Sequence, residues 1–212
     1  MRRISAGLLA LFATVALAVT APAAGAHGLK LVPASAGGQS PGELLGDIWV
    51  GSLSGRHLPY LGTCTTYERI VVVPHPTADN APIHCTMRQD QSVFFAWGAF
   101  CGTFDGVYTR AKQLACALEY DREIQSITVS VDGGVPVDFH SPRFEFATPQ
   151  RWVWVAAGND FELPPQLATF TAHGWAALLK GLRPGPHRIV RTAMVAGFDE
   201  PAVQTVLVSV TR

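Results

Sequence analysis

The chain of 212 residues carries 16 basic and 16 acidic side chains, and charged residues make up only 15% of it. A nucleic-acid-binding protein needs a concentrated basic face, so this even balance argues against nucleic acid as a partner. A chain with so few charges can bury a large core, and its length predicts a single domain.

The first 26 residues have the features of a signal peptide. Arg2 and Arg3 form a positive start, and Leu8–Val19 is an apolar stretch too short to cross a bilayer. Ala24, Gly25 and Ala26 fit a cleavage site before His27, and Ala21-Pro22-Ala23 is the alternative site. We therefore expect a secreted or extracytoplasmic protein without a membrane span in its mature chain, exported by general secretion rather than by the twin-arginine route.

Four cysteines in an exported chain predict two disulfides. Of the three pairings that four cysteines allow, we favour Cys64–Cys85 and Cys101–Cys116, because both close short local loops. Each bond would stabilise the fold by about 3 kcal/mol by constraining the unfolded chain. A zinc site is the alternative, and the lack of a Cys-x-x-Cys pair argues against it.

The mature chain is expected to begin with a flexible lead-in over residues 27–40, which are rich in Gly, Ala, Ser and Pro. A helix should follow, because Ser40 and Glu43 form a capping box and Pro41 occupies the first helical position. Its apolar face repeats at helical spacing and comprises Leu44, Leu45, Ile48, Trp49 and Leu53.

Strand signals dominate from residue 62 onward. The apolar run Val93–Phe100 is typical of a strand buried on both faces. The secondary structure of Tyr108–Tyr120 is ambiguous, since its Ala and Leu residues would also suit a short helix. Further strand candidates are Arg69–Val73, Ile124–Val131, Val135–Phe139, Arg143–Phe146, Arg151–Ala156, His187–Val195 and Gln204–Val210. We predict a mainly β fold over residues 41–212: an immunoglobulin-like or jelly-roll β-sandwich with one short N-terminal helix.

Several groups of residues match the motifs of one protein family: Cys85, Val93–Phe95, Cys101, Cys116–Ala117, Val129–Gly133, Ser141–Phe146, Gly174–Trp175 and Leu182–Ile189. Through them, the chain from about Ser40 to its end resembles a family of uncharacterised secreted bacterial proteins. The family combines a C-x-V-P-x-G-K-x-x-F-F-P segment, a V-D-G hairpin, an S-P-x-F-x-F strand and an L-x-P-G-x-H corner, and Glu43–Ser54 is similar to the tryptophan-bearing helix at its start. The chain departs from the pattern where Met87–Gln91 replaces V-P-x-G-K and Ala96 replaces the last proline. The resemblance implies the fold and export, and it implies no catalytic residue.

His27 is the candidate metal ligand. A mature chain that begins His-Gly could bind copper through its amine and imidazole, an arrangement similar to the histidine brace of secreted copper oxygenases. A second histidine would be required, and His57, His75, His84, His140, His173 and His187 all remain open. The simpler interpretation is an N-terminus that happens to start with histidine.

Trp152 and Trp154 are the candidate ligand-binding residues. They are two positions apart, so a strand would place both on one face, where indoles can form a platform for sugar rings. Tryptophan is more often largely buried in the core. The neighbouring Pro149-Gln150 and Asn159-Asp160 look like loops, which favours exposure.

Two other groups of residues are expected to be structural. His187 follows Pro-Gly-Pro in the corner, where its ring should hydrogen-bond the turn backbone. Glu119, Asp121 and Glu123 could be catalytic carboxylates, but a solvated charged surface is the simpler interpretation.

We therefore predict a secreted, non-catalytic binding or structural module that needs no cofactor. Its expected ligand is a carbohydrate or another envelope component, and a protein ligand or a pure scaffold role remains open. The alternative is a secreted copper-dependent oxygenase that uses His27.

Overall fold

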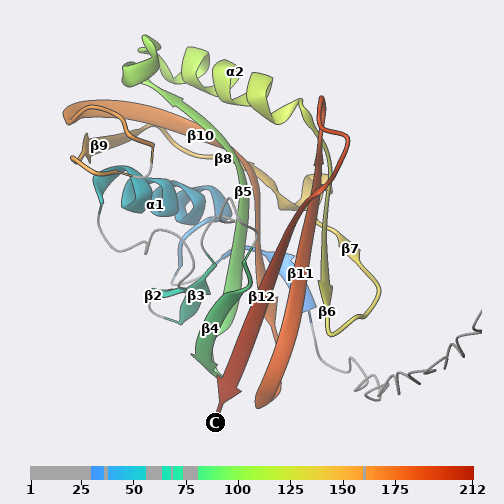
Figure 1. Cartoon of the computed structure of the whole chain (residues 1–212). Helices are drawn as coiled ribbons and strands as arrows, with labels where there is room; N and C mark the ends of the chain where they lie inside the picture. The colour runs from blue at the N-terminus through green and yellow to red at the C-terminus, as the bar shows by residue number, and fades with distance from the viewer. Residues whose placement is uncertain (1–29, 36–37, 56–63, 68, 74–80, 160) are drawn as a thin grey trace, which may run out of the picture.

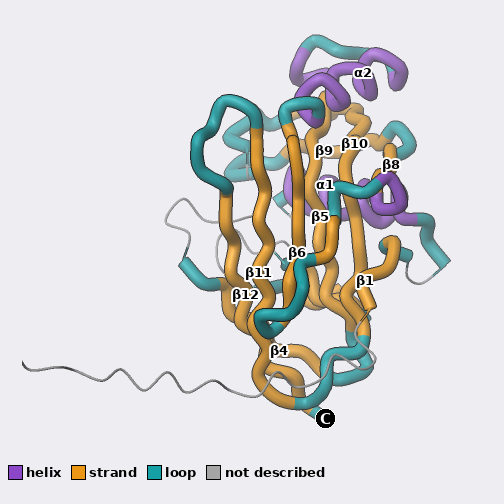
Figure 2. Tube along the Cα trace, turned by 90° about the vertical axis from the view of Figure 1, so that its right-hand side faces the viewer, coloured by secondary structure: helices purple, strands orange, loops and turns teal. Residues whose placement is uncertain are grey.

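The computed structural model describes residues 30–35, 38–55, 64–67, 69–73, 81–159 and 161–212. Within them the chain is mainly β, with two mixed sheets and two α-helices (Figures 1 and 2). The predicted signal peptide and His27 lie outside these residues. No helix in the described part of the chain is long and apolar enough to cross a membrane.

The first sheet is built around two long strands. It has the order β1-β10-β5-β3-β2, and β8 and β9 also pair with β10. β10 runs antiparallel to β5 from Phe170–Gly102 to Leu179–Val93, whereas β3 runs parallel to β5. The strands are β1 (Lys30–Pro33), β2 (Thr65–Tyr67), β3 (Ile70–Val72), β5 (Ser92–Gly102), β8 (Glu145–Ala147), β9 (Arg151–Val155) and β10 (Gln166–Lys180).

The second sheet has the order β4-β12-β11-β6-β7. β4 and β12 are parallel, and the other neighbours are antiparallel. The sheet faces the first one (Figure 1), and one apolar core contains side chains from both, which is the arrangement of a β-sandwich. Its strands are β4 (Ile83–Arg88), β6 (Ile124–Val131), β7 (Val137–Asp138), β11 (Gly185–Val195) and β12 (Ala202–Thr211).

β5 is buried on both faces, as its apolar run predicts. Val93 and Phe95 point into the core between the sheets, while Phe94 points to the opposite face of the first sheet. Because that outer face is also apolar, it needs a cover of its own.

Helix α1 (Pro41–Ser54) provides that cover. The predicted capping box is present, since Ser40 Oγ accepts a hydrogen bond from the Glu43 amide and the Glu43 carboxylate accepts one from the Ser40 amide. Four members of the predicted apolar face are buried and Ile48 is half-buried. They pack on β9, β10 and β5 in a second core.

The prediction of a single helix is wrong, because Arg110–Asp121 forms a second one, α2. It lies across the end of the first sheet (Figures 1 and 2). It buries Gln113, Ala117 and Asp121 rather than the Ala and Leu positions that favoured a helix from the sequence. Those apolar positions are small or half-exposed, so α2 is fixed by polar contacts and a disulfide more than by an apolar stripe.

Several strands differ from their predicted extents. Lys30–Pro33, which the sequence assigned to the lead-in, pairs with the end of β10. Arg143–Phe146 was expected to be a strand, but Pro142–Phe144 is a 3₁₀ turn (η2) and only Glu145–Ala147 pairs. The sequence predicts no strand over Gln166–Lys180, where β10 forms, because β9 offers a partner that the local sequence does not reveal.

The structure pairs Cys64 with Cys85 and Cys101 with Cys116, the pairing that loop length favours. The second bond attaches α2 to the end of β5, just before the 3₁₀ turn Thr103–Asp105 (η1).

Removal of this second bond gives a first prediction. A Cys101→Ala, Cys116→Ala variant should lose about 3 kcal/mol of unfolding free energy, because a loop of about 15 residues is no longer closed in the unfolded chain. Urea unfolding of the variant beside the parent protein measures the loss. Equal midpoints for the two proteins would contradict the prediction.

Candidate functional site

The structure exposes both predicted ligand-binding tryptophans. Trp152 is 72% and Trp154 is 59% exposed, although the alternate residues Val153 and Val155 are buried against α1. β9 thus has one face in a core and one face that carries two adjacent indoles. The burial of these indoles in the core, the more common placement for tryptophan, is not observed.

The indoles belong to a wider apolar surface. Leu167 of β10 lies directly opposite Trp154 in the sheet and is 63% exposed. These three residues, Trp152, Trp154 and Leu167, form what we call the indole face. It lies at the end of the first sheet that extends away from β11 and β12 (Figure 1), so the second sheet does not cover it.

Helix α2 is tied to the strands that carry the indole face. The buried Gln113 side chain donates from Nε2 to the Thr169 carbonyl and hydroxyl oxygens, both at 3.1 Å, and to the Val107 carbonyl at 2.9 Å. Its Oε1 accepts from Gln150 Nε2 at 3.0 Å and from Thr171 at 3.1 Å. Thr169 pairs with Trp152, and Gln150 directly precedes β9. One side chain therefore fixes both strands of the indole face.

The indole face carries no charge of its own. The only charged residue in β9 and in the facing residues 166–170 is Arg151. Its guanidinium turns to the other side, where it donates to the Glu43 carbonyl at 3.1 Å and pairs with Asp47 at 3.2 Å. An uncharged ligand therefore matches this surface best.

A cluster of one histidine and two carboxylates joins the other end of α2 to the sheet. His173 Nδ1 lies 2.7 Å from an Asp121 carboxylate oxygen, and its Nε2 lies 3.2 Å from the Glu145 carboxylate. Burial raises the pKa of Asp121 above its ordinary value, and the hydrogen bond and charge of His173 oppose this rise. Both ring nitrogens face carboxylates, so the ring has no free nitrogen to activate a nucleophile, and the cluster is a structural contact.

The expectation that Glu119, Asp121 and Glu123 form a solvated surface is wrong for Asp121. Glu119 and Glu123 are exposed as predicted for a solvated surface, but Asp121 is only 4% exposed. Gln113, Ala117 and Asp121 are spaced four residues apart, so they lie on one side of α2. This spacing of small and polar residues was the sequence signal for the side of α2 that packs on the sheet.

A second buried charge lies between the two sheets. Arg191 of β11 donates from Nη1 to the Ala96 carbonyl at 2.8 Å, and its guanidinium carbon lies 4.9 Å from the Trp97 ring centroid. Burial lowers the pKa of Arg191 to about 10, so it stays charged at neutral pH. With 2% of the residue exposed, it can contact no ligand from solution without a rearrangement.

The candidate copper ligands are not brought together where the structure describes them. His84, His140, His173 and His187 lie on different elements, and the described residues contain no group of three His, Cys, Asp or Glu side chains that could hold a metal. His57 and His75, like His27, fall outside the described ranges. The copper site stays a prediction.

His187 has the structural role predicted for it. Nε2 donates to the Arg183 carbonyl at 2.8 Å, which closes the corner, and Nδ1 lies 2.7 Å from an Asp132 carboxylate oxygen. The other oxygen of Asp132 accepts from the Arg188 amide at 2.8 Å.

Comparisons with known proteins add no functional information. No protein-family model matches the chain, and no curated protein matches it. Among solved structures, a chain described as "Solution Structure of Amebosin" aligns at 12% identity over 68% of this chain and 100% of its own, with a TM-score of 0.25. A TM-score this low supports no argument about fold or function.

Proposed function

We propose that the protein is a secreted, non-catalytic module that binds a neutral polysaccharide through the indole face. The observation that carries this proposal is the exposure of Trp152 and Trp154 from a strand whose other face is buried. Such a surface is unfavourable in water unless a ligand covers it, and exposed apolar patches commonly mark binding sites.

The chemistry of the indole face favours sugars. Two indoles at positions i and i+2 of a strand are spaced about 7 Å apart along it, and their flat rings can stack on the apolar faces of successive sugars. The indole face itself carries no charged side chain, since Arg151 turns toward α1, and this favours a neutral glycan over an acidic one. The two disulfides and the N-terminal signal features support an oxidising, extracytoplasmic location.

The strand order supports the immunoglobulin-like form of the proposed sandwich. β12, β11, β6 and β7 follow the G-F-C-C′ order of a variable-type domain. The likeness to secreted bacterial proteins with the V-D-G, S-P-x-F-x-F and L-x-P-G-x-H motifs is part of the same proposal.

Substitution of the two indoles tests the proposal. In depletion assays on insoluble cellulose, chitin, xylan and starch, at least one polymer should bind the wild-type protein. Trp152→Ala or Trp154→Ala should each weaken that binding about 10- to 30-fold, and the double variant more than about 100-fold, because large aromatic anchors dominate binding energy.

Matched variants separate stacking from general adhesion. Phe198, which is 70% exposed between β11 and β12, provides a control, and Phe198→Ala should bind as the parent does. Trp152→Phe and Trp154→Phe should retain part of the affinity, because they keep a ring. Undiminished binding by the double alanine variant, or no binding to any polymer, would refute the proposed function.

A further inference from the structure

A groove on the other side of the first sheet is independent of the indole face. It lies between α1 and β2 and has a volume of about 470 Å³, within the range of about 300–1,000 Å³ found for small-molecule sites. Its walls are formed by Leu44, Asp47, Ile48, Val50, Gly51, Ser54, Thr65, Thr66, Tyr67 and Val72.

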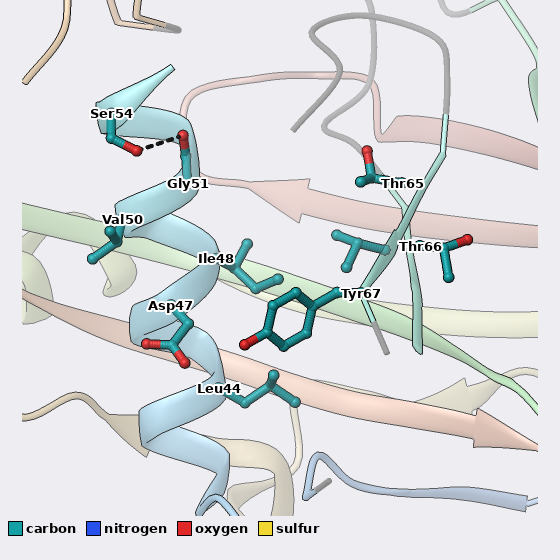
Figure 3. Close-up of a pocket in the computed structure, with 10 residues that line it drawn as sticks. Leu44, Asp47, Ile48, Val50, Gly51, Ser54, Thr65, Thr66 and Tyr67 are labelled. Carbon is teal, nitrogen blue, oxygen red and sulfur yellow. Dashed lines mark hydrogen bonds between the residues drawn. The ribbon is translucent and has the colours of Figure 1, made fainter. Parts of the chain in front are cut away.

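The groove is an apolar slot with an aromatic wall. Leu44 and Ile48 point from α1 toward the ring of Tyr67, which projects from β2 (Figure 3). Tyr67 is 46% exposed, so part of its ring is open to a ligand. A flat apolar molecule that lies against Leu44, Ile48 and Tyr67 would cover all three.

The charge of the lining excludes most ionic ligands. Asp47 is its one carboxylate, and that charge is already balanced by Arg151 at 3.2 Å and hydrogen-bonded by Gln39. Figure 3 shows Asp47 at the side of the helix, whereas Ile48 faces Tyr67. A charged ligand would lose its hydration here without gaining a free counter-charge.

The groove also offers a hydrogen-bonding group. Figure 3 shows the Tyr67 hydroxyl directed toward α1, whereas the hydroxyls of Thr65 and Thr66 point away from Ile48. The Thr65 hydroxyl is also buried, so a ligand in the groove does not reach it. A phenol both donates and accepts hydrogen bonds, so a polar group of the ligand can pair with Tyr67 while the apolar part covers the ring.

We propose that the groove between α1 and β2 binds an uncharged, mainly apolar small molecule that carries one hydrogen-bonding group. The apolar body lies along Leu44, Ile48 and the Tyr67 ring, and the polar group meets the Tyr67 hydroxyl. This is a second site, because the indoles of β9 point away from α1.

Two fluorescent probes that differ by one charge test this site on the full chain. N-phenyl-1-naphthylamine is uncharged, apolar and carries one N–H group, and 8-anilinonaphthalene-1-sulfonate adds a sulfonate to the same skeleton. We expect saturable binding of the uncharged probe and at least tenfold weaker binding of the sulfonate. Absence of saturable binding, or equal affinity for both probes, would overturn the proposal.

Variants locate the probe. Tyr67→Ala should weaken binding of the uncharged probe at least tenfold, and Tyr67→Phe should weaken it by a smaller factor, since the ring is kept. Tyr108→Ala is the matched control, because Tyr108 is an exposed tyrosine outside the groove. The Trp152→Ala, Trp154→Ala double variant should also bind as the parent does, which keeps this test separate from the test of polysaccharide binding. Unchanged affinity in Tyr67→Ala would place the probe elsewhere and refute the site.

Discussion

Replacement of Gly174 by alanine is expected to cost about 3–5 kcal/mol of unfolding free energy, a large share of the stability of a typical domain. Gly174 of β10 pairs directly with Gly98 of β5, and both have φ near +155°. A Cβ atom at Gly174 would overlap the Trp97 carbonyl oxygen and lie 2.6 Å from the Gly98 Cα. The clash is with backbone, which a side-chain movement cannot relieve, so the two central strands would separate.

Urea unfolding monitored by circular dichroism measures this cost, and Gly185→Ala is the matched control. Gly185 has φ +129° but no atom within 4 Å of an added Cβ. Its alanine variant should therefore show only the backbone strain, about 1–2 kcal/mol. Equal losses at the two positions would contradict a close approach of β5 and β10.

Removal of the His173 side chain is expected to have a similarly large effect. His173→Ala should cost about 3–5 kcal/mol at neutral pH, because it leaves the Asp121 carboxylate buried without its partner. The raised pKa of Asp121 makes this cost dependent on pH. When the pKa of a carboxyl is higher in the folded than in the unfolded protein, the protonated form stabilises the fold. This contribution to stability is complete below the unfolded-state pKa, and it is lost as the pH rises through the folded-state pKa.

The raised pKa of Asp121 also decides how the stability of His173→Ala changes with pH. Without the hydrogen bond and charge of His173, the pKa of Asp121 should rise further, so acidification from pH 7 toward pH 4 should recover stability. The Asp121→Asn, His173→Ala double variant differs only in that carboxyl and is the proper reference. We expect His173→Ala to be less stable than the double variant at pH 7 and to approach it in acid. Equal stabilities of the two at pH 7 would show that the buried charge carries no cost.

Features encoded within a few residues were predictable from the sequence. The capping box at Ser40 starts α1, and the uninterrupted apolar run of β5 predicts burial on both faces, because each depends on adjacent side chains alone. The two disulfide pairings follow from short loop lengths in the same way.

Features that depend on strand register were not predictable. Leu167 joins the indole face only because β10 extends to pair with β9 at Trp154. Asp121, Glu145 and His173 are far apart in the sequence and meet only when α2 lies on the first sheet. The groove likewise needs α1 and β2 to be positioned by the sheet before Tyr67 faces Ile48.

The exposure of Trp152 and Trp154 was predictable only in part. Their spacing placed them on one face, but the identity of that face depended on which side α1 covers. α1 packs against Val153 and Val155, and this choice leaves the indoles in solvent.

The most direct test of the polysaccharide-binding face is ¹⁹F NMR of protein labelled with 5-fluorotryptophan. The chain has five tryptophans, whose resonances can be assigned from single Trp→Phe variants. A soluble oligosaccharide of the bound polymer should shift or broaden the signals of Trp152 and Trp154, and leave those of Trp49, Trp97 and Trp175 unchanged. Binding that leaves both signals of β9 unchanged would contradict the account.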